Sequence, residues 1–544
     1  MTGSVNLGEG VLLEICRVGD RRPCGKACRV TAADGIDFAM NSAGNARAPF
    51  STTQWLIVIL AAIGFLFDTY ELLMTPLVAP AALSELLKVP QNSPLVTAWV
   101  GKLLWITALC GGVFGLLGGW LTDKLGRKTV MAGAIFIYSF SPVAAAFSKS
   151  IEAFVLFRCT TFIGVCVEFV AAITWLSEVF EDKKQRERWL GLTQAFASLG
   201  GVFVTLMSKW ISEHASTLPA LGLPAGLGGG AAANWRYLLL TGMLPAIPIA
   251  LLLPFVPESR IWKEKRAAGT LKRPSFAGLF SPQLRKVTLL TAALSACAYG
   301  IAFGALQVTV ARVTPGLPEL APQAKQLVPL RKEAETLNRE LLALIEKGSG
   351  AAEQKPARDL IRENFAKQKP LIDQVQKVSN NVQWFQEMGG LAGRIALALL
   401  LIVGMARRSL LRVFQFPAIF VLPVTYFVLF GKGGDAFLWG YAACGFLTVA
   451  QFSYFGEYLP KVFPLHLRGT GGSFATNVGG RMIGTSASLL TTLVIAPFLA
   501  HGADAVRPMH IAQAAGWVAA GIAVLALVLG WFLPEPGKEE DLER

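Results

Sequence analysis

The stretch from Gly119 to Lys128 reads Gly-Trp-Leu-Thr-Asp-Lys-Leu-Gly-Arg-Lys and lies between two long apolar runs. It concentrates one acidic residue, two glycines and three cations in a short connection. An apolar run of about 20 residues is long enough to cross the hydrocarbon core of a bilayer as a helix. The stretch therefore predicts a tight turn between two membrane-spanning helices.

The composition is typical of a membrane protein. Of 544 residues, 53% are hydrophobic and 16% are charged, whereas a soluble domain carries about 25% charged residues. Because the apolar runs are continuous rather than alternating, they predict helices and not a β-barrel. The net charge of +14 comes from cations in short loops between the runs, which the positive-inside rule explains without a nucleic-acid partner. The expected fold class is therefore an all-α membrane protein.

We expect twelve spans, which lie roughly at 55–83, 94–118, 129–148, 151–178, 189–211, 236–256, 286–312, 388–406, 412–431, 435–457, 470–498 and 512–533. An even number of spans puts both termini on one side of the membrane. The loops after even-numbered spans are rich in Lys and Arg, and the opposite short loops are poor in them. Both termini are therefore expected in the cytoplasm.

The opening stretch resembles the loop signature of major facilitator superfamily transporters, G-x-L-x-D-[RK]-x-G-R-[RK], with every fixed position matched. The resemblance implies twelve helices in two six-helix halves, with a solute bound near the membrane midplane between them. Motifs at Val256–Trp262 and Leu533–Lys538 resemble those that follow spans 6 and 12 in the sugar porter and metabolite–proton symporter branch. In the second half, only Arg407 and Arg408 remain of the loop signature.

The same resemblance implies a gate at the cytoplasmic ends of the helices. Asp123 is expected to brace these ends, and Arg127 is expected to reach Glu178 at the end of span 4. The gating candidates are Gly119, Asp123, Gly126, Arg127, Glu178, Glu457 and Arg468.

The domain organisation follows from the spans and the loops between them. A disordered cytoplasmic tail is expected at 1–50, with Met40 as an alternative start. The other expected segments are a first half at 51–256, a cytoplasmic central loop at 257–285, a second half at 286–533 and a cytoplasmic tail at 534–544.

An insertion at 313–383 interrupts the second half. Leucines and an alanine recur there at spacings of three and four, which predicts a helix. A second helix is expected after Pro356, with Pro370 kinking or dividing it. Parity places this helical hairpin outside the cytoplasm. It would serve either as a spacer or lid on the outer rim, or as a docking site for a protein partner or a second copy.

Span 1 carries two acidic residues, Asp68 and Glu71. They are three residues apart, which places them on one side of the helix. Two carboxylates in a low-dielectric crevice do not readily ionise together, so this pair suits a site that binds and releases a proton. Arg158 in span 4 is the expected partner, because the resemblance to sugar–proton symporters pairs a span-1 acid with this arginine. The alternative is that these charges only brace the bundle.

A charged or polar side chain inside a span is a candidate for substrate contact. The substrate-binding candidates are Glu168, Gln194, Gln307, Arg394, Asn477 and Arg481. The two arginines in the second half would suit an anionic substrate, although each could instead pair with Glu387 or Glu457.

These features predict a secondary active transporter for a small polar or anionic metabolite, namely a sugar, a sugar acid or an aromatic or other organic acid. Proton symport by alternating access is the expected mechanism. A facilitative uniporter or exporter is one alternative, and a membrane receptor or assembly component that acts through the 313–383 hairpin is another. We expect no enzymatic activity, cofactor or metal site, and a location in a bacterial inner membrane.

Overall fold

Twelve helical segments of the described residues are long and apolar enough to cross a membrane, which confirms the expected number. The computed structural model describes residues 51–87, 94–180, 183–214, 217–219, 221, 234–347, 350–500 and 507–536. Thr53–Arg544 forms one unit. The expected N-terminal tail at 1–50 lies outside the described residues.

The first half contains six spans, two of which are interrupted. Its elements are α2 (Thr52–Leu87), α3 (Pro94–Leu125), α4 (Arg127–Ala146), α5 (Ile151–Val179), α6 (Lys183–Ala195), α7 (Ala197–Glu213), α8 (Asn234–Leu240), η2 (Thr241–Met243), α9 (Ala246–Leu252) and η3 (Leu253–Phe255). Span 5 breaks at Phe196, between α6 and α7. Span 5 also approaches span 1 very closely, because a Cβ atom added at Gly200 would lie 2.0 Å from the main-chain oxygen of Leu66.

The second half follows the short helix α10 (Arg260–Ala267). Its main elements are α11 (Arg285–Ile301), η5 (Ala302–Leu306), η6 (Thr309–Val313), α12 (Ala321–Glu346), α13 (Ala351–Ile402), α14 (Arg407–Val424), η9 (Thr425–Leu429), α15 (Phe430–Lys432), α16 (Gly434–Val462), α17 (Arg468–Ser473), η11 (Phe474–Gly484), α18 (Ala487–Leu489), η12 (Leu490–Ile495), α19 (Ala496–Leu499) and α20 (Pro508–Trp531). Five of these elements, η5, η6, η9, η11 and η12, are π-helical stretches. Such stretches often occur at functional sites, and η11 carries two of the substrate-binding candidates.

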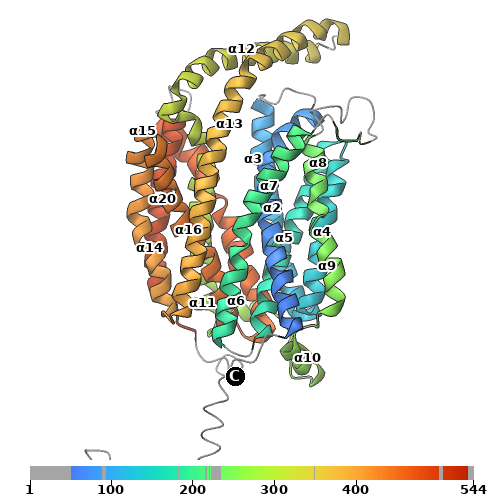
Figure 1. Cartoon of the computed structure of the whole chain (residues 1–544), viewed down its shortest axis with the longest axis vertical. Helices are drawn as coiled ribbons and strands as arrows, with labels where there is room; N and C mark the ends of the chain where they lie inside the picture. The colour runs from blue at the N-terminus through green and yellow to red at the C-terminus, as the bar shows by residue number, and fades with distance from the viewer. Residues whose placement is uncertain are drawn as a thin grey trace, which may run out of the picture. The chain divides into compact units, whose positions relative to one another are not determined.

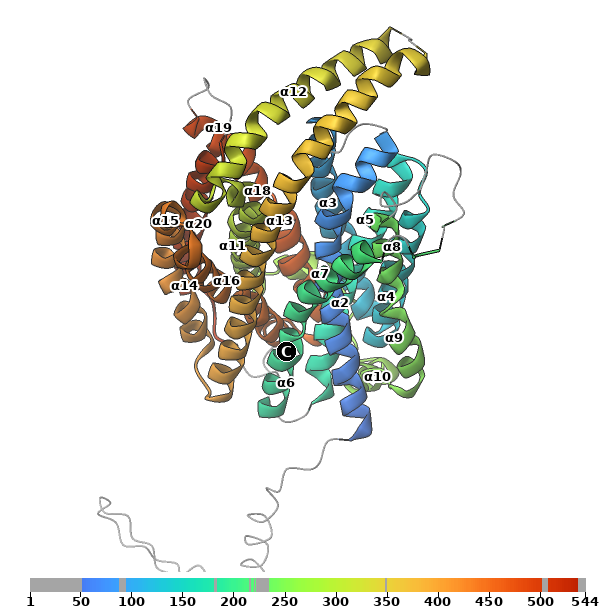
Figure 2. The same cartoon turned by 45° about the horizontal axis from the view of Figure 1, so that its top comes forward.

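Helices α12 and α13 form an antiparallel pair at the end of the bundle opposite α10 (Figures 1 and 2). Leu341 of α12 packs against Ala357 and Ile361 of α13. The buried amide of Asn364 donates to the main-chain oxygen of Leu330 at 3.1 Å. The expected division of the second helix at Pro370 is wrong, because α13 is a single helix of 52 residues that continues through span 8. Pro370 is exposed, and the helix continues on both sides of the missing N–H.

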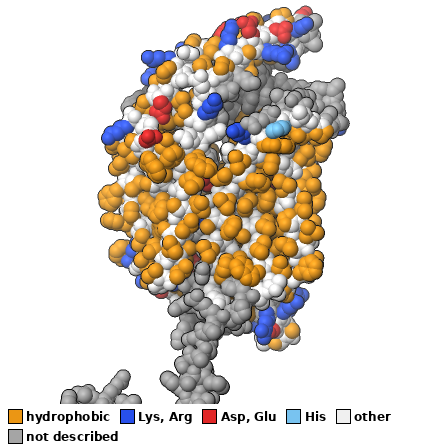
Figure 3. Space-filling model, viewed as in Figure 1, with side chains coloured by type: hydrophobic (Ala, Val, Ile, Leu, Met, Phe, Trp, Pro, Cys, Tyr) orange, Lys and Arg blue, Asp and Glu red, His pale blue; other side chains and the backbone are white. Residues whose placement is uncertain are grey.

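The distribution of side-chain types over the surface of the bundle fits helices that span a membrane. Hydrophobic side chains cover a broad band over the spans, and Lys, Arg, Asp and Glu gather beyond it at both ends (Figure 3). Large apolar side chains such as Phe498 and Phe255 are 80% and 72% exposed. Together with the twelve apolar helices, this band identifies an integral membrane protein.

Candidate functional site

A buried network of charges joins the two halves at the end of the bundle near α10. The Asp123 carboxylate accepts the main-chain N–H groups of Gly469 and Thr470 at 2.9 and 2.7 Å, and the Thr470 hydroxyl at 2.7 Å. Arg127 lies 3.0 Å from Glu178 in an ion pair whose side chains are fully buried. The expected contact between Arg127 and Glu178 is therefore present in the structure.

Two further contacts from this network cross between the halves. The Arg127 guanidinium donates to the main-chain oxygen of Leu465 at 2.9 Å. Arg468 lies 3.6 Å from Glu178. A Cβ atom added at Gly119 would lie 2.5 Å from the main-chain oxygen of Gly469, so this position requires glycine for the halves to meet. The gating candidates of the two halves are thus in direct contact at this end.

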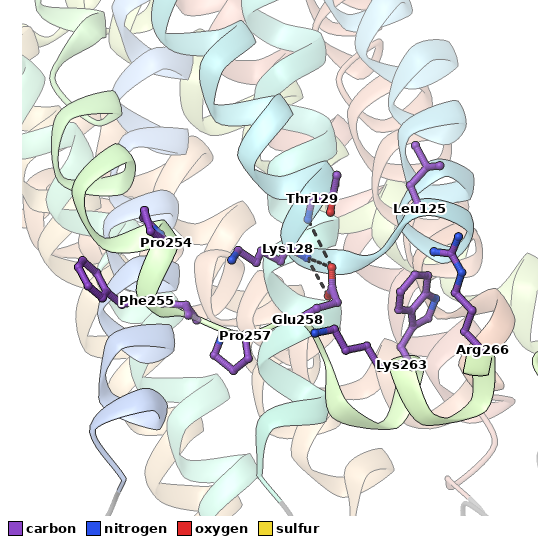
Figure 4. A pocket seen from close by; sticks show the side chains of 11 residues that line it. Leu125, Lys128, Thr129, Pro254, Phe255, Pro257, Glu258, Lys263 and Arg266 are labelled. Atoms are coloured by element: carbon purple, nitrogen blue, oxygen red, sulfur yellow. Dashed lines mark hydrogen bonds between the residues drawn. The ribbon is translucent and has the colours of Figure 1, made fainter. Parts of the chain in front are cut away.

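Glu258, which follows span 6, caps the start of α4. Its carboxylate accepts the main-chain N–H group of Arg127 at 2.9 Å. It also accepts the main-chain N–H group of Lys128 at 3.0 Å (Figure 4). An anion at a helix N-terminus satisfies free N–H groups and matches the helix dipole. Gly126, which precedes α4, has a φ of 110° and contacts this carboxylate closely. A side chain at this position would both strain the turn and displace the cap.

The second half repeats this arrangement. Glu535 accepts the main-chain N–H groups of Arg407 and Arg408 at 3.2 and 2.9 Å, at the start of α14. The Arg407 side chain lies 2.9 Å from Glu457, as Arg127 does from Glu178 in the first half. Lys461 also pairs with Glu457. The remnant of the loop signature in the second half therefore keeps two contacts of the intact loop, namely the glutamate cap and the arginine–glutamate pair.

Sequence reasoning did not assign Glu258 and Glu535 to this site. Their signal was a Pro-Glu motif at corresponding places after spans 6 and 12. The motif showed the repeat, but not that each carboxylate folds back onto the helix of its own half.

The ion pair expected in the first half forms between Glu71 and Arg158. The Arg158 guanidinium lies 3.5 Å from the Glu71 carboxylate, and both side chains are almost fully buried. The same guanidinium donates to the main-chain oxygen of Glu71 at 3.2 Å and to the Thr75 hydroxyl at 2.5 Å. One carboxylate oxygen of Glu71 accepts no bond from the described residues. Thr75, one turn beyond Glu71, was not expected at this site.

Asp68 does not share this cation. Its carboxyl group lies within hydrogen-bonding distance of Glu168 from α5, and Arg481 of η11 is the nearest cation that acts on both acids. The Glu168 carboxyl also presses against α2, because a Cβ atom added at Gly64 would lie 2.1 Å from its Oε1. Spacing along span 1 placed Asp68 and Glu71 together, whereas the structure gives them different neighbours.

Arg481 reaches from the second half into the first half. Its guanidinium lies 5.2 Å from the ring centre of Phe169 and 5.9 Å from that of Phe162, both on α5. It donates to Asn477 at 3.1 Å. Asn477 in turn donates to the main-chain oxygen of Cys166 at 3.1 Å, which ties η11 to α5. Arg481 is 7% exposed, and it lies near the rings of Phe162 and Phe169 and near the carboxyl groups of Asp68 and Glu168.

The remaining substrate-binding candidates lie elsewhere. Arg394 of α13 donates at 2.5 Å to the main-chain oxygen of Gln194, near the end of α6, where helix carbonyl groups need partners. Its nearest acidic neighbour is Glu387 on the same helix. The Gln194 side chain lies against Gly456 of α16. Gln307 is half-buried just after η5. Arg394 and Arg481 have Tyr299 as a common neighbour, whereas no direct contact among the described residues joins any of these three candidates to Arg481.

Comparison with known proteins agrees with this geometry. Residues 55–323 match the family model described as Major Facilitator Superfamily. The niacin transporter NiaP of Acinetobacter baylyi is 27% identical over 39% of this chain and 42% of its own length. The 4-hydroxybenzoate transporter PcaK of Pseudomonas putida is 28% identical over 46% of this chain and 52% of its own length. The chain thus matches about half the length of these curated relatives.

A solved structure extends the comparison to both halves. The proton:xylose symporter XylE superposes with a TM-score of 0.63 at 15% identity, over 91% of this chain and 99% of that one. At this identity the likeness concerns the fold alone. Twelve spans, the repeated loop contacts, the family match and the common fold lead to one conclusion: the chain belongs to the major facilitator superfamily.

Proposed function

We propose that this protein is a secondary transporter, not an enzyme, and that it carries a small organic acid by proton symport and alternating access. The observation that carries the proposal is Arg481, a buried guanidinium held between the halves against the rings of Phe162 and Phe169. A guanidinium can bind a carboxylate through two parallel hydrogen bonds. Aromatic rings beside it suit a planar, unsaturated acid.

The chemistry of the relatives supports this substrate class. Niacin and 4-hydroxybenzoate, which the relatives NiaP and PcaK are named for, are aromatic monocarboxylic acids. A third relative is named a cis,cis-muconate transport protein, and muconate is an unsaturated dicarboxylic acid. A sugar offers no anion for Arg481. We therefore favour an organic acid over the sugar that the branch of the family would also allow.

Glu71 and Arg158 are the proposed proton-coupling pair. While Glu71 is ionised, it compensates the charge of Arg158, whose side chain is buried as its own is. A proton on Glu71 would remove this compensation and release the guanidinium from the carboxylate. A change in the ion pair can then bias which end of the transporter is closed.

The network around Asp123 is the proposed inner gate. It holds the two halves together in the described state, because Asp123 and Arg127 of the first half bond to the main chain of the second half. We further propose that this end faces the cytoplasm, with both termini, and that the protein resides in a bacterial inner membrane. The α12–α13 hairpin would then lie on the side of the membrane opposite the cytoplasm, as a spacer or as the docking site for a protein partner.

Uptake by reconstituted protein tests the function. Proteoliposomes are given labelled nicotinate, 4-hydroxybenzoate, cis,cis-muconate or D-xylose, with and without an imposed pH gradient, acidic outside. We expect a carboxylate to accumulate against its gradient only when the pH gradient is present, and D-xylose not to accumulate.

Two variants separate symport from facilitated diffusion. Glu71→Gln should accumulate the acid less than the wild type under the same pH gradient, and Arg481→Ala should stop binding the carboxylate but remain folded. Accumulation that ignores the pH gradient, or that is undiminished in Glu71→Gln, would refute proton coupling through this pair. Transport of D-xylose alone would refute the substrate class.

A further inference from the structure

Two buried carboxyl groups face each other between the first and fourth spans. Asp68 on α2 is 5% exposed and Glu168 on α5 is fully buried. Neither oxygen of either group accepts a hydrogen bond from the rest of the described residues. The Glu168 carboxyl nevertheless lies against α2 one turn from Asp68, because a Cβ atom added at Gly64 would lie 2.1 Å from its Oε1, and the two carboxyl groups are hydrogen-bonding neighbours. Ionised carboxylates only accept hydrogen bonds, so a bond between them requires a proton on one of the two.

The groups that surround the pair leave its charge incompletely balanced. Arg481 from η11 supplies one positive charge. Tyr138 from α4 is fully buried near the pair, and its hydroxyl has no bond to the other described residues. Glu71 on α2 is compensated by its own partner, Arg158. Two ionised acids beside Arg481 would therefore leave one uncompensated negative charge in the membrane, which is unfavourable because a buried ion loses its hydration.

We infer that Asp68 and Glu168 share one proton in the substrate-free protein, and that the pair takes up a second proton when a carboxylate substrate binds Arg481. The inference rests on the proposed function. The net charge of the site supports this inference both without and with bound substrate. With one shared proton, the pair carries one negative charge and balances Arg481. When a substrate carboxylate takes over Arg481, a second proton from the outer solution neutralises the pair, and the site is again neutral.

The pair is thus a proton-binding site separate from Glu71. A cycle that loads both sites moves two protons with one monocarboxylate anion, and so carries one net positive charge inward. Such transport is accelerated by an interior-negative membrane potential. Because either acid can accept the substrate-linked proton, loss of one acid should preserve this voltage dependence, and loss of both should abolish it.

The transport test compares Asp68→Asn, Glu168→Gln and the double variant in proteoliposomes, with nicotinate as the probe and a potassium diffusion potential as the driving force. We expect the wild type and both single variants to accelerate several-fold when the interior is negative. The double variant should ignore the potential but still respond to the pH gradient through Glu71. A control, Thr448→Val, replaces another buried polar group without a hydrogen bond among the described residues and should behave as the wild type. Loss of voltage dependence in Asp68→Asn alone, or its survival in the double variant, would overturn the inference.

Infrared spectroscopy tests the shared proton without a substrate. A protonated carboxylic acid has a carbonyl stretching band that an ionised carboxylate lacks, and the band shifts in deuterated water. The wild type at neutral pH should show a component of this band that is absent from both Asp68→Asn and Glu168→Gln and present in Thr448→Val. If neither substitution changes the band, the pair does not share a proton. Failure of the wild type to carry any of the four probes would refute the proposed function, while this spectrum would still decide on the shared proton.

Discussion

Substitution of Asp123 by alanine should open the inner gate. The Asp123 carboxylate accepts three hydrogen bonds from the other half, at 2.9, 2.7 and 2.7 Å. A hydrogen bond to an ionised group contributes about 1.5 kcal/mol or more. Water would recover part of this when the gate opens, so we count about 1 kcal/mol for each bond, or about 3 kcal/mol together. The population of the inner-open state should then rise on the order of 100-fold.

Cysteine labelling can measure this change. Gly472 is a suitable reporter, because it is buried at the contact between the halves and an added Cβ atom would meet only Val170, at 3.7 Å. Gly472→Cys is introduced into a variant whose native cysteines are replaced, and its rate of reaction with a maleimide is measured in nanodiscs. We expect Asp123→Ala to raise this rate by roughly two orders of magnitude, and Asp435→Ala, at the exposed start of α16, to leave it unchanged.

An increase of less than threefold for Asp123→Ala would refute the reasoning, because it would show that these bonds do not hold the gate. The fold of the first half is not at issue in this test. Arg127 also pairs with Glu178 at 3.0 Å, and we expect this ion pair to remain when Asp123 is replaced.

Three further outcomes are expected. Gly200→Ala should yield little folded protein by size-exclusion chromatography, because its Cβ atom would lie 2.0 Å from the main-chain oxygen of Leu66. The control Gly521→Ala, whose Cβ atom would have nothing within 4 Å, should give the yield of the wild type. Equal yields of the two variants would contradict the close contact between spans 1 and 5. Glu258→Ala should lower the thermal unfolding temperature by a few degrees, since a helix cap contributes about 1 kcal/mol, and an unchanged temperature would show that the cap contributes no stability. Replacement of residues 321–376 by a short Gly-Ser linker should leave uptake intact, and loss of uptake in a folded variant would show that the hairpin is part of the transport machinery.

The helices could be predicted from the sequence because their apolar runs are long and continuous. The break in span 5 could not, since Phe196 is neither a proline nor a glycine. At this break Arg394, from the other half, bonds to the main-chain oxygen of Gln194. A tertiary contact of this kind leaves no local signal in the sequence.

The contacts of the candidate site were likewise predictable from the sequence only in part. Arg127 and Glu178 could be paired because the resemblance to the major facilitator superfamily implies this contact at the ends of the spans. Asp68 and Glu71 are three residues apart, which turns their side chains by about 60° relative to each other around the helix. In a helix surrounded by other helices, this angle is enough to direct one acid to Arg158 and the other to Glu168. Spacing fixes the angle, but only the packing of the neighbours decides what each side chain meets.

The continuity of α13 has a practical consequence for imaging. Residues 351–376 of this helix extend about 39 Å beyond span 8, at 1.5 Å per residue. A rotation of the second half by 10° would therefore sweep the tip of the hairpin through about 7 Å, by simple geometry on that helix length. Small transporters give electron-microscopy images few features outside the detergent or lipid disc. The α12–α13 hairpin is such a feature, and because α13 is continuous with span 8, the hairpin would report the tilt of the second half.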